Sequence, residues 1–500
     1  MKNMMVVGGG TAGCIASLML KTAFPHLNIK LIESSKVGIV GVGESSTEHW
    51  SNFCQFIGIN RLDAILHCNA TFKIGVYFEN WSKSDFMHSI KHDFTETFDG
   101  YFATYSHLIA NDSDPKELCG SFAFKNKIST NHFNNLNDSP TRQYHFDTFL
   151  LNKFLHNKCL EKNIEVIIDD ILRVNLDENI GNIKSVVGNL KEYNSDFFID
   201  CSGFSRFLLE KTYDVKWKSY SEYLPLNSAI AFPTDEMEEY NIYTKSTARK
   251  FGWSWTIPTQ SRTGNGYVYC NQYIDRDQAH QEMEECYGQP LDIAREFKFD
   301  PGRLEKSWYK NCYAVGLSQS FVEPLEATSI GSIIQQMFCF INFFPSFDVE
   351  SCNEHVNNIF DNIIDYVQAH YLVKREDTQF WRDVKYNLKL TPNLERYLHK
   401  WKNRMPNSND FHCPWGLFSP VNYIPILYGL DWFDREKIKN EYFNYVDPSL
   451  QKNIVKELND IKDPIFSIGH KKFIKEVLVN GYSRDQPKQK KNKENKFIYD

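Results

Sequence analysis

The sequence predicts an α/β protein, because strand-like and helix-like segments alternate near its N-terminus and its C-terminal part is mainly helical. Residues 4–8 form an apolar run that leads into glycines, and residues 12–22 have the apolar spacing of a helix. Residues 28–33 form a second strand-like run that ends in an acid. This order is a βαβ unit. Residues 328–344 and most of 354–403 have helical spacing.

The other elements follow from the same patterns. We expect a loop at the glycine-rich residues 34–47. Residues 216–270 are expected to be strand-rich, with an apolar run at 267–270. The remaining predicted helices cover residues 49–56, 62–68 and 147–162, and the remaining strands cover 165–169, 196–200 and 311–316.

Size and charge narrow the class of protein. The chain has 500 residues, a net charge of −7 and 15% aromatic residues. This acidic balance argues against binding to nucleic acid or to an anionic membrane surface. No apolar run is long enough to span a membrane, and no secretory signal precedes the first strand. The twelve cysteines contain no CxxC pair, so we expect reduced thiols, no metal site and a cytoplasmic location.

A glycine-rich loop between the first strand and the first helix predicts dinucleotide binding. Gly8-x-Gly10-x-x-Gly13 allows a tight turn and close approach to a pyrophosphate. Glu33 follows about twenty residues later and can accept hydrogen bonds from a ribose. The alternative is a plain turn that packs a helix on a sheet. The motif fits both NAD and FAD, but a late strand at 312–317 favours FAD, because flavoproteins return there to the flavin.

Two tryptophans and one lysine are candidates for the chemistry. Trp253 and Trp255 alternate on a predicted strand and therefore face the same side, either as a functional wall or as a core pair. Lys73 lies in a mostly apolar stretch, and on one strand it would share a face with Thr71, Gly75 and Tyr77. A buried ammonium needs an anion or a partner; the alternative is an edge-strand lysine in water.

The segment before the helix at 328–344 predicts an anion site. Residues 324–329 (PLEATS) end at the helix start, where backbone N–H groups attract anions. Glu326 in this segment is either catalytic or an ordinary acid at a helix N-terminus.

Together and in this order, the glycine loop, residues 253–258 (WSWTIP) and residues 321–331 (FVEPLEATSIG) resemble the flavin-dependent halogenases of the tryptophan halogenase type. Further matching segments bring the resemblance to about residues 4–435. It implies a flavoprotein monooxygenase-like FAD-binding domain with an intertwined, mainly helical substrate-binding module. We expect an FAD- and halide-binding domain at 1–350, substrate-facing insertions at about 70–145 and 210–270, a helical module at 351–480, and a polar lysine-rich tail at 481–500.

The resemblance implies a role for specific residues. Lys73 and Glu326 would be catalytic, Thr328 and Ser329 would bind the halide, and Phe98, Tyr423 and Ile424 would contact the substrate. The residues expected at the cofactor are Gly8, Gly9, Gly10, Thr11, Ala12, Gly13, Glu33, Ser34, Glu44, Ser45, Ile171, Trp253, Trp255, Leu317 and Ile330.

Four positions depart from the family pattern. Ser45 stands where the family has Ala, Ala327 where it has Ser, and Ser329 where it has Gly. Ile424 replaces the second aromatic of a pair that helps to hold an amino-acid substrate. These changes put a strict preference for free tryptophan and for chloride in doubt. We expect small indoles and phenols as substrates, with bromide or iodide at least matching chloride.

The implied reaction uses reduced FAD from a separate flavin reductase, together with O2 and a halide ion. Hypohalous acid would form near Thr328 and Ser329 and react with a small electron-rich aromatic at Lys73 and Glu326. The alternatives are a flavin-dependent aromatic monooxygenase, which needs direct contact between substrate and flavin, and a non-catalytic flavin-binding protein. The sequence is compatible with a homo-oligomer but does not determine the oligomeric state.

Overall fold

The computed structural model describes residues 1–39, 44–89, 100–113, 126–129, 143–411, 413–462 and 467–480. Parts of the sequence predictions lie outside these ranges, namely residues 40–43 of the predicted loop, much of the predicted insertion at about 70–145 together with Phe98, and the tail at 481–500.

A mainly parallel sheet carries the N-terminal βαβ unit. Its strand order is β21-β22-β13-β1-β2-β9. β1 runs parallel to both neighbours, with Val6 opposite Leu31 and Ile199. Residues 4–7 are buried on both faces, which confirms the predicted buried parallel strand. The strands are β1 (Asn3–Val7), β2 (Asn28–Glu33), β9 (Glu165–Ile168), β13 (Phe197–Asp200), β21 (Trp308–Tyr309) and β22 (Cys312–Ala314).

Helices bury one face of this sheet. α1 packs against α6 and α8, and α8 packs in turn against α2 and α9. Residues 325–346 are long and apolar enough to cross a membrane, but the apolar side chains of α8 lie in the protein core. The helices are α1 (Thr11–Ala23), α2 (His49–Ile57), α3 (Asp63–His67), α6 (Thr148–Glu161), α8 (Thr328–Phe343) and α9 (Val349–Ala369).

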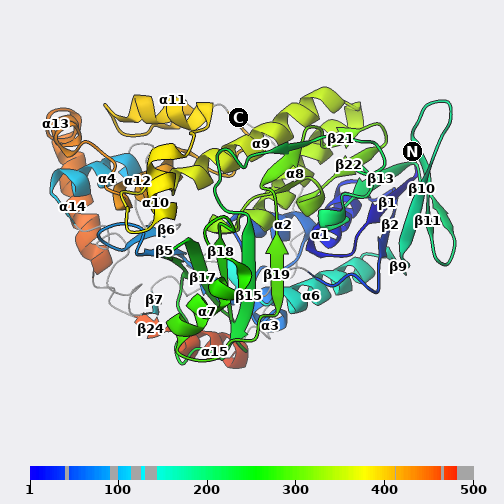
Figure 1. The fold of residues 1–500 in the computed structure, drawn as a ribbon, viewed down its shortest axis with the longest axis horizontal. Helices are drawn as coiled ribbons and strands as arrows, with labels where there is room; N and C mark the ends of the chain where they lie inside the picture. Colours follow the sequence, from blue (N-terminus) through cyan, green and yellow to red (C-terminus); the bar gives the residue numbers. More distant parts are fainter. Residues whose placement is uncertain are drawn as a thin grey trace.

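A second sheet lies beside the first, at the centre of Figure 1, and carries the tryptophan pair on β17. Its order is β19-β15-β18-β17-β16-β5-β6, and α7 (Arg276–Tyr287) packs on β15 and β18. The strands are β5 (Gly75–Glu79), β6 (Phe86–Ser89), β15 (Ser228–Thr234), β16 (Thr244–Ala248), β17 (Gly252–Pro258), β18 (Thr263–Tyr269) and β19 (Arg295–Lys298).

The prediction that Lys73, Gly75 and Tyr77 share one strand is wrong. The chain breaks at Ile74, whose N–H donates to Ile242 O at 2.8 Å. Lys73 ends β4 (Thr71–Lys73), which joins a small sheet in the order β3-β8-β4, whereas β5 joins the second sheet. β3 is Glu44–Ser45 and β8 is Gln143–Phe146. The break separates Lys73 from β5 and places it in the same small sheet as Ser45.

The C-terminal half is mainly helical, as predicted, and α4 (Gly100–Ala110) from the N-terminal half packs against its helices α12, α13 and α14. This intertwining is visible at the left of Figure 1. The helices are α10 (Gln379–Asn387), α11 (Pro392–Trp401), α12 (Pro420–Gly429), α13 (Arg435–Tyr445), α14 (Pro448–Lys462) and α15 (His470–Asn480).

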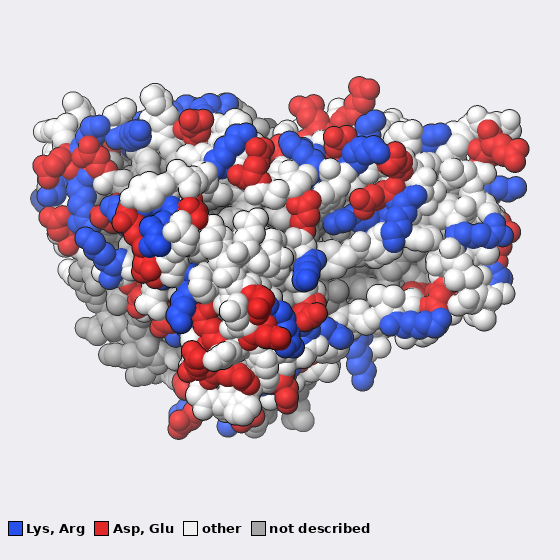
Figure 2. All heavy atoms as spheres, viewed as in Figure 1, with Lys and Arg blue, Asp and Glu red and all other residues white. Residues whose placement is uncertain are grey.

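Three small antiparallel sheets complete the described fold. They consist of β10 (Ile171–Leu176), β11 (Ile183–Gly188) and β12 (Glu192–Asn194); of β14 (Trp217–Ser219), β20 (Gly302–Leu304) and β23 (Ser320–Phe321); and of β7 (Lys127–Ser129) and β24 (Ser467–Gly469). On the face shown in Figure 2, Lys and Arg are interspersed with Asp and Glu.

Candidate active site

The glycine turn leaves open space in front of the first helix. A Cβ at Gly8 would lie 2.1 Å from Cys201 O, and one at Gly13 would lie 1.8 Å from Gly8 O, so both positions require glycine. At Gly10 a Cβ would meet nothing within 4 Å, and no side chain caps α1 there. The first N–H groups of a helix have no acceptor within the helix. Open space beside them fits the pyrophosphate of a dinucleotide.

Glu33 lies at the end of β2 next to this turn, as predicted. Its Oε2 is 3.0 Å from Nε2 of His156, which also lies 2.9 Å from Gly9 O. The hydrogen bond to Glu33 raises the pKa of His156. His156 could not be predicted, because an isolated histidine within a helix carries no motif. Ser34 hydrogen-bonds Asp170, next to Ile171, so these two predicted cofactor residues lie close together.

The late turn returns to the start of α1. Gly316 has φ 68°, and a Cβ there would lie 2.8 Å from Ala12 Cβ. Leu317 lies in the short 3-10 helix η4 (Gly316–Ser318), which follows β22. The late strand therefore ends beside the start of α1, whereas its predicted contact with the flavin stays a prediction.

The tryptophan pair forms a wall on β17. The rings of Trp253 and Trp255 have centroids 6.1 Å apart, and a Cβ at Gly266 on β18 would lie 2.1 Å from the Trp255 ring. Trp253 Nε1 and the Tyr371 hydroxyl both donate to Oε2 of Glu323, each at 2.6 Å. Burial raises the pKa of Glu323 to about 7 in spite of these bonds. Glu323 therefore fixes the orientation of the Trp253 indole.

One cavity of about 180 Å³ brings most of the central predicted residues together. Aromatic and aliphatic side chains form most of its wall, and the start of α8 closes one side. The predicted site residues that line it are Ser45, Lys73, Trp253, Trp255, Leu317, Glu326, Thr328, Ser329 and Ile330. An apolar, aromatic wall beside helix-terminal amides fits a flat ring system and a small anion.

Lys73 is fully buried at the end of β4. Its Nζ donates to Ser45 Oγ and to Ser46 O, each at 3.2 Å. Burial lowers the pKa of Lys73 to about 8, and the negative charges of Glu326 and Glu48 partly offset this effect. The alternative of an exposed edge-strand lysine is wrong for this residue.

Glu326 lies inside η5 (Leu325–Ala327), a strained turn that leads directly into α8. Glu326 has φ 64° and Ala327 has φ 57°, so two consecutive residues that are not glycine adopt the left-handed region. Such conformations cost about 1–3 kcal/mol each and concentrate at functional sites. The turn directs the Glu326 side chain into the protein and leaves the start of α8 without a side-chain cap.

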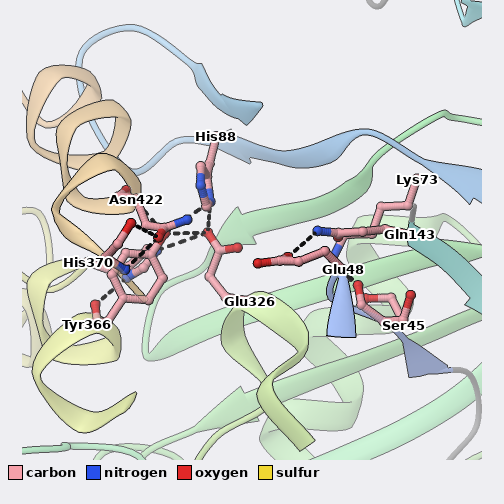
Figure 3. A network of polar contacts seen from close by, with 11 residues as sticks. Ser45, Glu48, Lys73, His88, Gln143, Glu326, Tyr366, His370 and Asn422 are labelled. Atoms are coloured by element: carbon pink, nitrogen blue, oxygen red, sulfur yellow. Dashed lines mark hydrogen bonds and ion pairs between the residues drawn. The ribbon is translucent and has the colours of Figure 1, made fainter. Parts of the chain in front are cut away.

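Two histidines and a tyrosine hold the Glu326 carboxylate (Figure 3). Its Oε1 lies 2.8 Å from His88 Nδ1, 3.3 Å from His370 Nε2 and 3.4 Å from the Tyr366 hydroxyl. Burial opposes ionisation, but His88 and His370 outweigh it and hold the pKa of Glu326 well below its ordinary value. None of these three partners was predicted from the sequence. His88 lies on β6, Tyr366 lies on α9, and His370 directly follows α9.

The predicted substrate contacts Tyr423 and Ile424 lie on α12 and are fully buried. Tyr423 packs among Tyr366, Trp401 and Phe411, with ring centroids 5.0, 5.2 and 5.3 Å away. Their role in substrate binding stays a prediction. Within the described ranges, no group of three or more His, Cys, Asp or Glu side chains could hold a metal ion.

The nucleotide turn and the walled cavity with its buried lysine and glutamate fit the arrangement that the resemblance to flavin-dependent halogenases implies. The family profile described as "Tryptophan halogenase" matches residues 3–440. The chain therefore belongs to the tryptophan halogenase family, and it is an enzyme that uses a flavin cofactor and a halide.

Named relatives support this assignment. The chain is 33% identical to 7-chloro-L-tryptophan 6-halogenase KtzR of Kutzneria sp. (strain 744), covering 85% of this chain and 90% of the relative. Its structure is similar to that of tryptophan 6-halogenase SttH from Streptomyces toxytricini, with a TM-score of 0.85, 28% identity, and 95% and 99% of the two chains covered. The structure is also similar to that of a tryptophan halogenase from Shewanella frigidimarina NCIMB 400, with a TM-score of 0.86, 24% identity, and 96% and 98% of the two chains covered. This likeness shows that the two proteins share a fold.

Proposed function

We propose that the protein is an FADH2-dependent halogenase that forms hypohalous acid from O2 and a halide and halogenates a small indole or phenol. The observation that carries this proposal is the single cavity that contains Lys73, Glu326, the tryptophan wall and the start of α8. The turn at Gly8–Gly13 and the acid Glu33 would hold the nucleotide part of FAD. Bound reduced FAD, reacting with O2, would supply the oxidising power for the halide.

The start of α8 would hold the halide. Its first amides, at Thr328 and Ser329, lie at the cavity without a side-chain cap. Helix-terminal amides attract anions through unpaired N–H groups and the helix dipole. Ser329 adds bulk where the family has glycine, and this supports a halide preference that differs from the family's.

Lys73 would receive the hypohalous acid. As an ammonium, Lys73 can donate a hydrogen bond to the acid and polarise its halogen. As a neutral amine it can instead be halogenated to a haloamine. A pKa of about 8 makes both forms accessible near neutral pH, so this proposal includes both routes.

The tryptophan wall supports halogenation over direct oxygenation. Trp253 and Trp255 line the cavity on one side, and Glu323 holds the Trp253 indole in place. Such a wall would keep an aromatic substrate from the flavin, whereas a monooxygenase needs that contact. A small neutral oxidant can still pass through the cavity to Lys73.

We also propose a cytoplasmic protein that receives reduced flavin from a separate flavin reductase. Every cysteine in the described ranges is free, which supports a reducing compartment. Where the family pattern has a second aromatic residue and a serine, this chain has Ile424 and Ala327. The loss of these groups on the expected substrate side favours small rings over free tryptophan.

The test is a reconstituted reaction with FAD, NADH and a separate flavin reductase. Indoles, phenols and free tryptophan are offered with chloride, bromide or iodide, and products are identified by mass. We expect halogenated indoles and phenols, with bromide or iodide at least matching chloride. Hydroxylated products that form without halide would instead support a monooxygenase, and a strict preference for tryptophan and chloride would contradict the proposed substrate class.

A further inference from the structure

The two oxygens of Glu326 face different surroundings. Every hydrogen bond or ion pair of the carboxylate within the described residues is made by Oε1. The second oxygen, Oε2, points away from the histidines toward the side on which Lys73 lies (Figure 3). Because Glu326 and Lys73 line the same cavity, Oε2 is the oxygen that a molecule beside Lys73 would meet.

The protonation of His370 follows from its contacts. Its Nδ1 lies 2.9 Å from the backbone oxygen of Tyr366, four residues earlier. A carbonyl oxygen only accepts, so Nδ1 carries a hydrogen. Nε2 lies 3.3 Å from Oε1 of Glu326, and two facing lone pairs would repel each other. One proton therefore lies between Nε2 and Oε1. With Glu326 ionised, Nε2 of His370 is the donor in this contact.

The contacts with His370 and His88 explain why the buried Glu326 carboxylate favours its ionised form. His370 and His88 are almost fully buried, with side-chain exposures of 1% and 3%. A buried carboxylate without such donors would favour its protonated form. His370 is also fixed at the C-terminal end of α9 by the Tyr366 carbonyl, so its imidazole cannot turn away without losing that bond.

We propose that His370 is a positioning residue that keeps Glu326 ionised and fixes Oε2 as the oxygen that accepts the proton of the arene. This inference rests on the proposed halogenase function. As the ring carbon bonds to the halogen, the halogen–oxygen bond breaks and its electron pair stays on oxygen. Lys73 gives one proton to this oxygen, which leaves as water.

The ring then loses its proton to Oε2, and the C–H electron pair restores aromaticity. The proton passes from Oε2 to the neutral Lys73 amine, so both residues return to their starting state. The balance is one hypohalous acid and one arene giving one haloarene and one water. His370 keeps its proton throughout.

The experiment compares the pH dependence of halogenation in His370→Leu, His370→Gln and wild type. The substrate is an indole accepted by the wild type, with pre-reduced FAD and bromide in a single turnover. In His370→Leu the carboxylate loses a donor. We expect the acid limb of the rate profile to move up by about one pH unit or more. The rate at neutral pH should fall by a smaller factor than on loss of the carboxylate itself, because the carboxylate stays ionised there but is held less firmly.

Gln at this position can donate to Oε1 but carries no charge. His370→Gln should therefore give a smaller rise of the acid limb and a partial recovery of the rate. A soluble diketone that traps free hypohalous acid should show halide oxidation unchanged in both variants. A ring-deuterated indole should react more slowly than the normal indole in His370→Leu, because proton loss becomes limiting.

His355→Leu is the matched control. His355 lies on the same helix, α9, and stacks on Phe343 with centroids 5.2 Å apart. Its removal should leave the acid limb in place. The other titratable groups that face or adjoin the Glu326–His370 pair are His88, Tyr366, Lys73, Glu48, and Tyr371 with its acceptor Glu323.

The outcomes separate this inference from the proposed function. An acid limb at the wild-type pH in both His370 variants, or a rate lowered equally at every pH, overturns the role of His370. If His370→Leu does not fold, an acid limb at the wild-type pH in His370→Gln alone is enough to overturn the role of His370. A wild type that halogenates no substrate with any halide overturns the proposed function itself.

Discussion

Replacing Lys73 by Met should abolish halogenation and also change how stability depends on pH. Lys73 is fully buried, and its pKa falls from an ordinary 10.5 to about 8. At about 1.4 kcal/mol per pH unit, this lowering corresponds to about 3 kcal/mol. The unfolded chain keeps the Lys73 proton up to pH 10.5, so between pH 8 and 10.5 it binds more protons than the folded protein. Wild-type stability therefore gains this amount across that window, and below pH 8 the folded protein carries the full cost.

Met fills similar space without a charge, so the stability of Lys73→Met should not increase between pH 8 and 10.5 as that of the wild type does. It also leaves Ser45 Oγ and Ser46 O without their donor, a pH-independent loss of about 1 kcal/mol each. The measurement is the free energy of unfolding by denaturant, taken at intervals from pH 7 to 10.5. Between pH 7 and pH 10.5, the free energy of unfolding of the variant should fall by about 3 kcal/mol relative to that of the wild type. FAD affinity should stay near normal, because Lys73 lies away from the glycine turn.

Lys245→Met is the matched control. Lys245 is half-buried on β16 and pairs with Glu79 at 2.8 Å. It should keep the wild-type pH dependence of unfolding and most of the halogenation rate. A pH-independent stability difference for Lys73→Met would refute the buried ammonium, and halogenation above about a tenth of the wild-type rate, a loss under ~1.4 kcal/mol, would refute its catalytic role.

Three further predictions concern the same site. Glu326→Gln should keep the fold and FAD affinity but slow single-turnover halogenation by about 10²-fold; an unchanged rate would leave Glu326 as a helix-terminal acid only. Ser45→Ala removes one acceptor of the Lys73 ammonium, so halogenation should fall by about threefold to tenfold, a cost of about 1 kcal/mol, while formation of free hypohalous acid stays constant; equal losses in both assays would place Ser45 at the flavin. NADPH with FAD but without a reductase should give no product, because the sequence shows one dinucleotide fingerprint, and turnover under those conditions would contradict this.

Local sequence patterns were sufficient for the elements with regular periodicity. The run into Gly8, the helix after Gly13 and the acid at Glu33 identify a βαβ unit because each has a known backbone requirement. The strand holding Lys73 was harder to predict. Lys73, Gly75 and Tyr77 were expected on one strand, and Gly75, which directly follows the break at Ile74, was not recognised as its mark. The break comes from competition between two sheets, since Ile74 N–H pairs with Ile242, and that information lies far away in the sequence.

That Lys73 and Glu326 belong to one site could be predicted, but the residues that support them could not. Lys73 and Glu326 stand in motifs with recognisable neighbours. His88 and His370 are isolated histidines nearly three hundred positions apart, and only the fold brings both to Oε1 of one carboxylate. The left-handed turn at Glu326 and Ala327 was equally hidden, because positive φ is usually associated with glycine and this segment contains none until Gly331.

The way the two charged groups are held explains how both can act on a third molecule. The ion pairs of Glu326 are made with His88 and His370, whereas the Lys73 ammonium donates to two uncharged oxygens of Ser45 and Ser46. A close lysine–glutamate bridge would direct their donors and acceptors at each other. Here Oε1 is occupied and Oε2 is directed toward the lysine side, while Ser45 Oγ and Ser46 O orient the Lys73 ammonium. Hypohalous acid is both a hydrogen-bond donor and an acceptor, so a cavity with a carboxylate oxygen on one side and an ammonium on the other can orient it and polarise it at the same time.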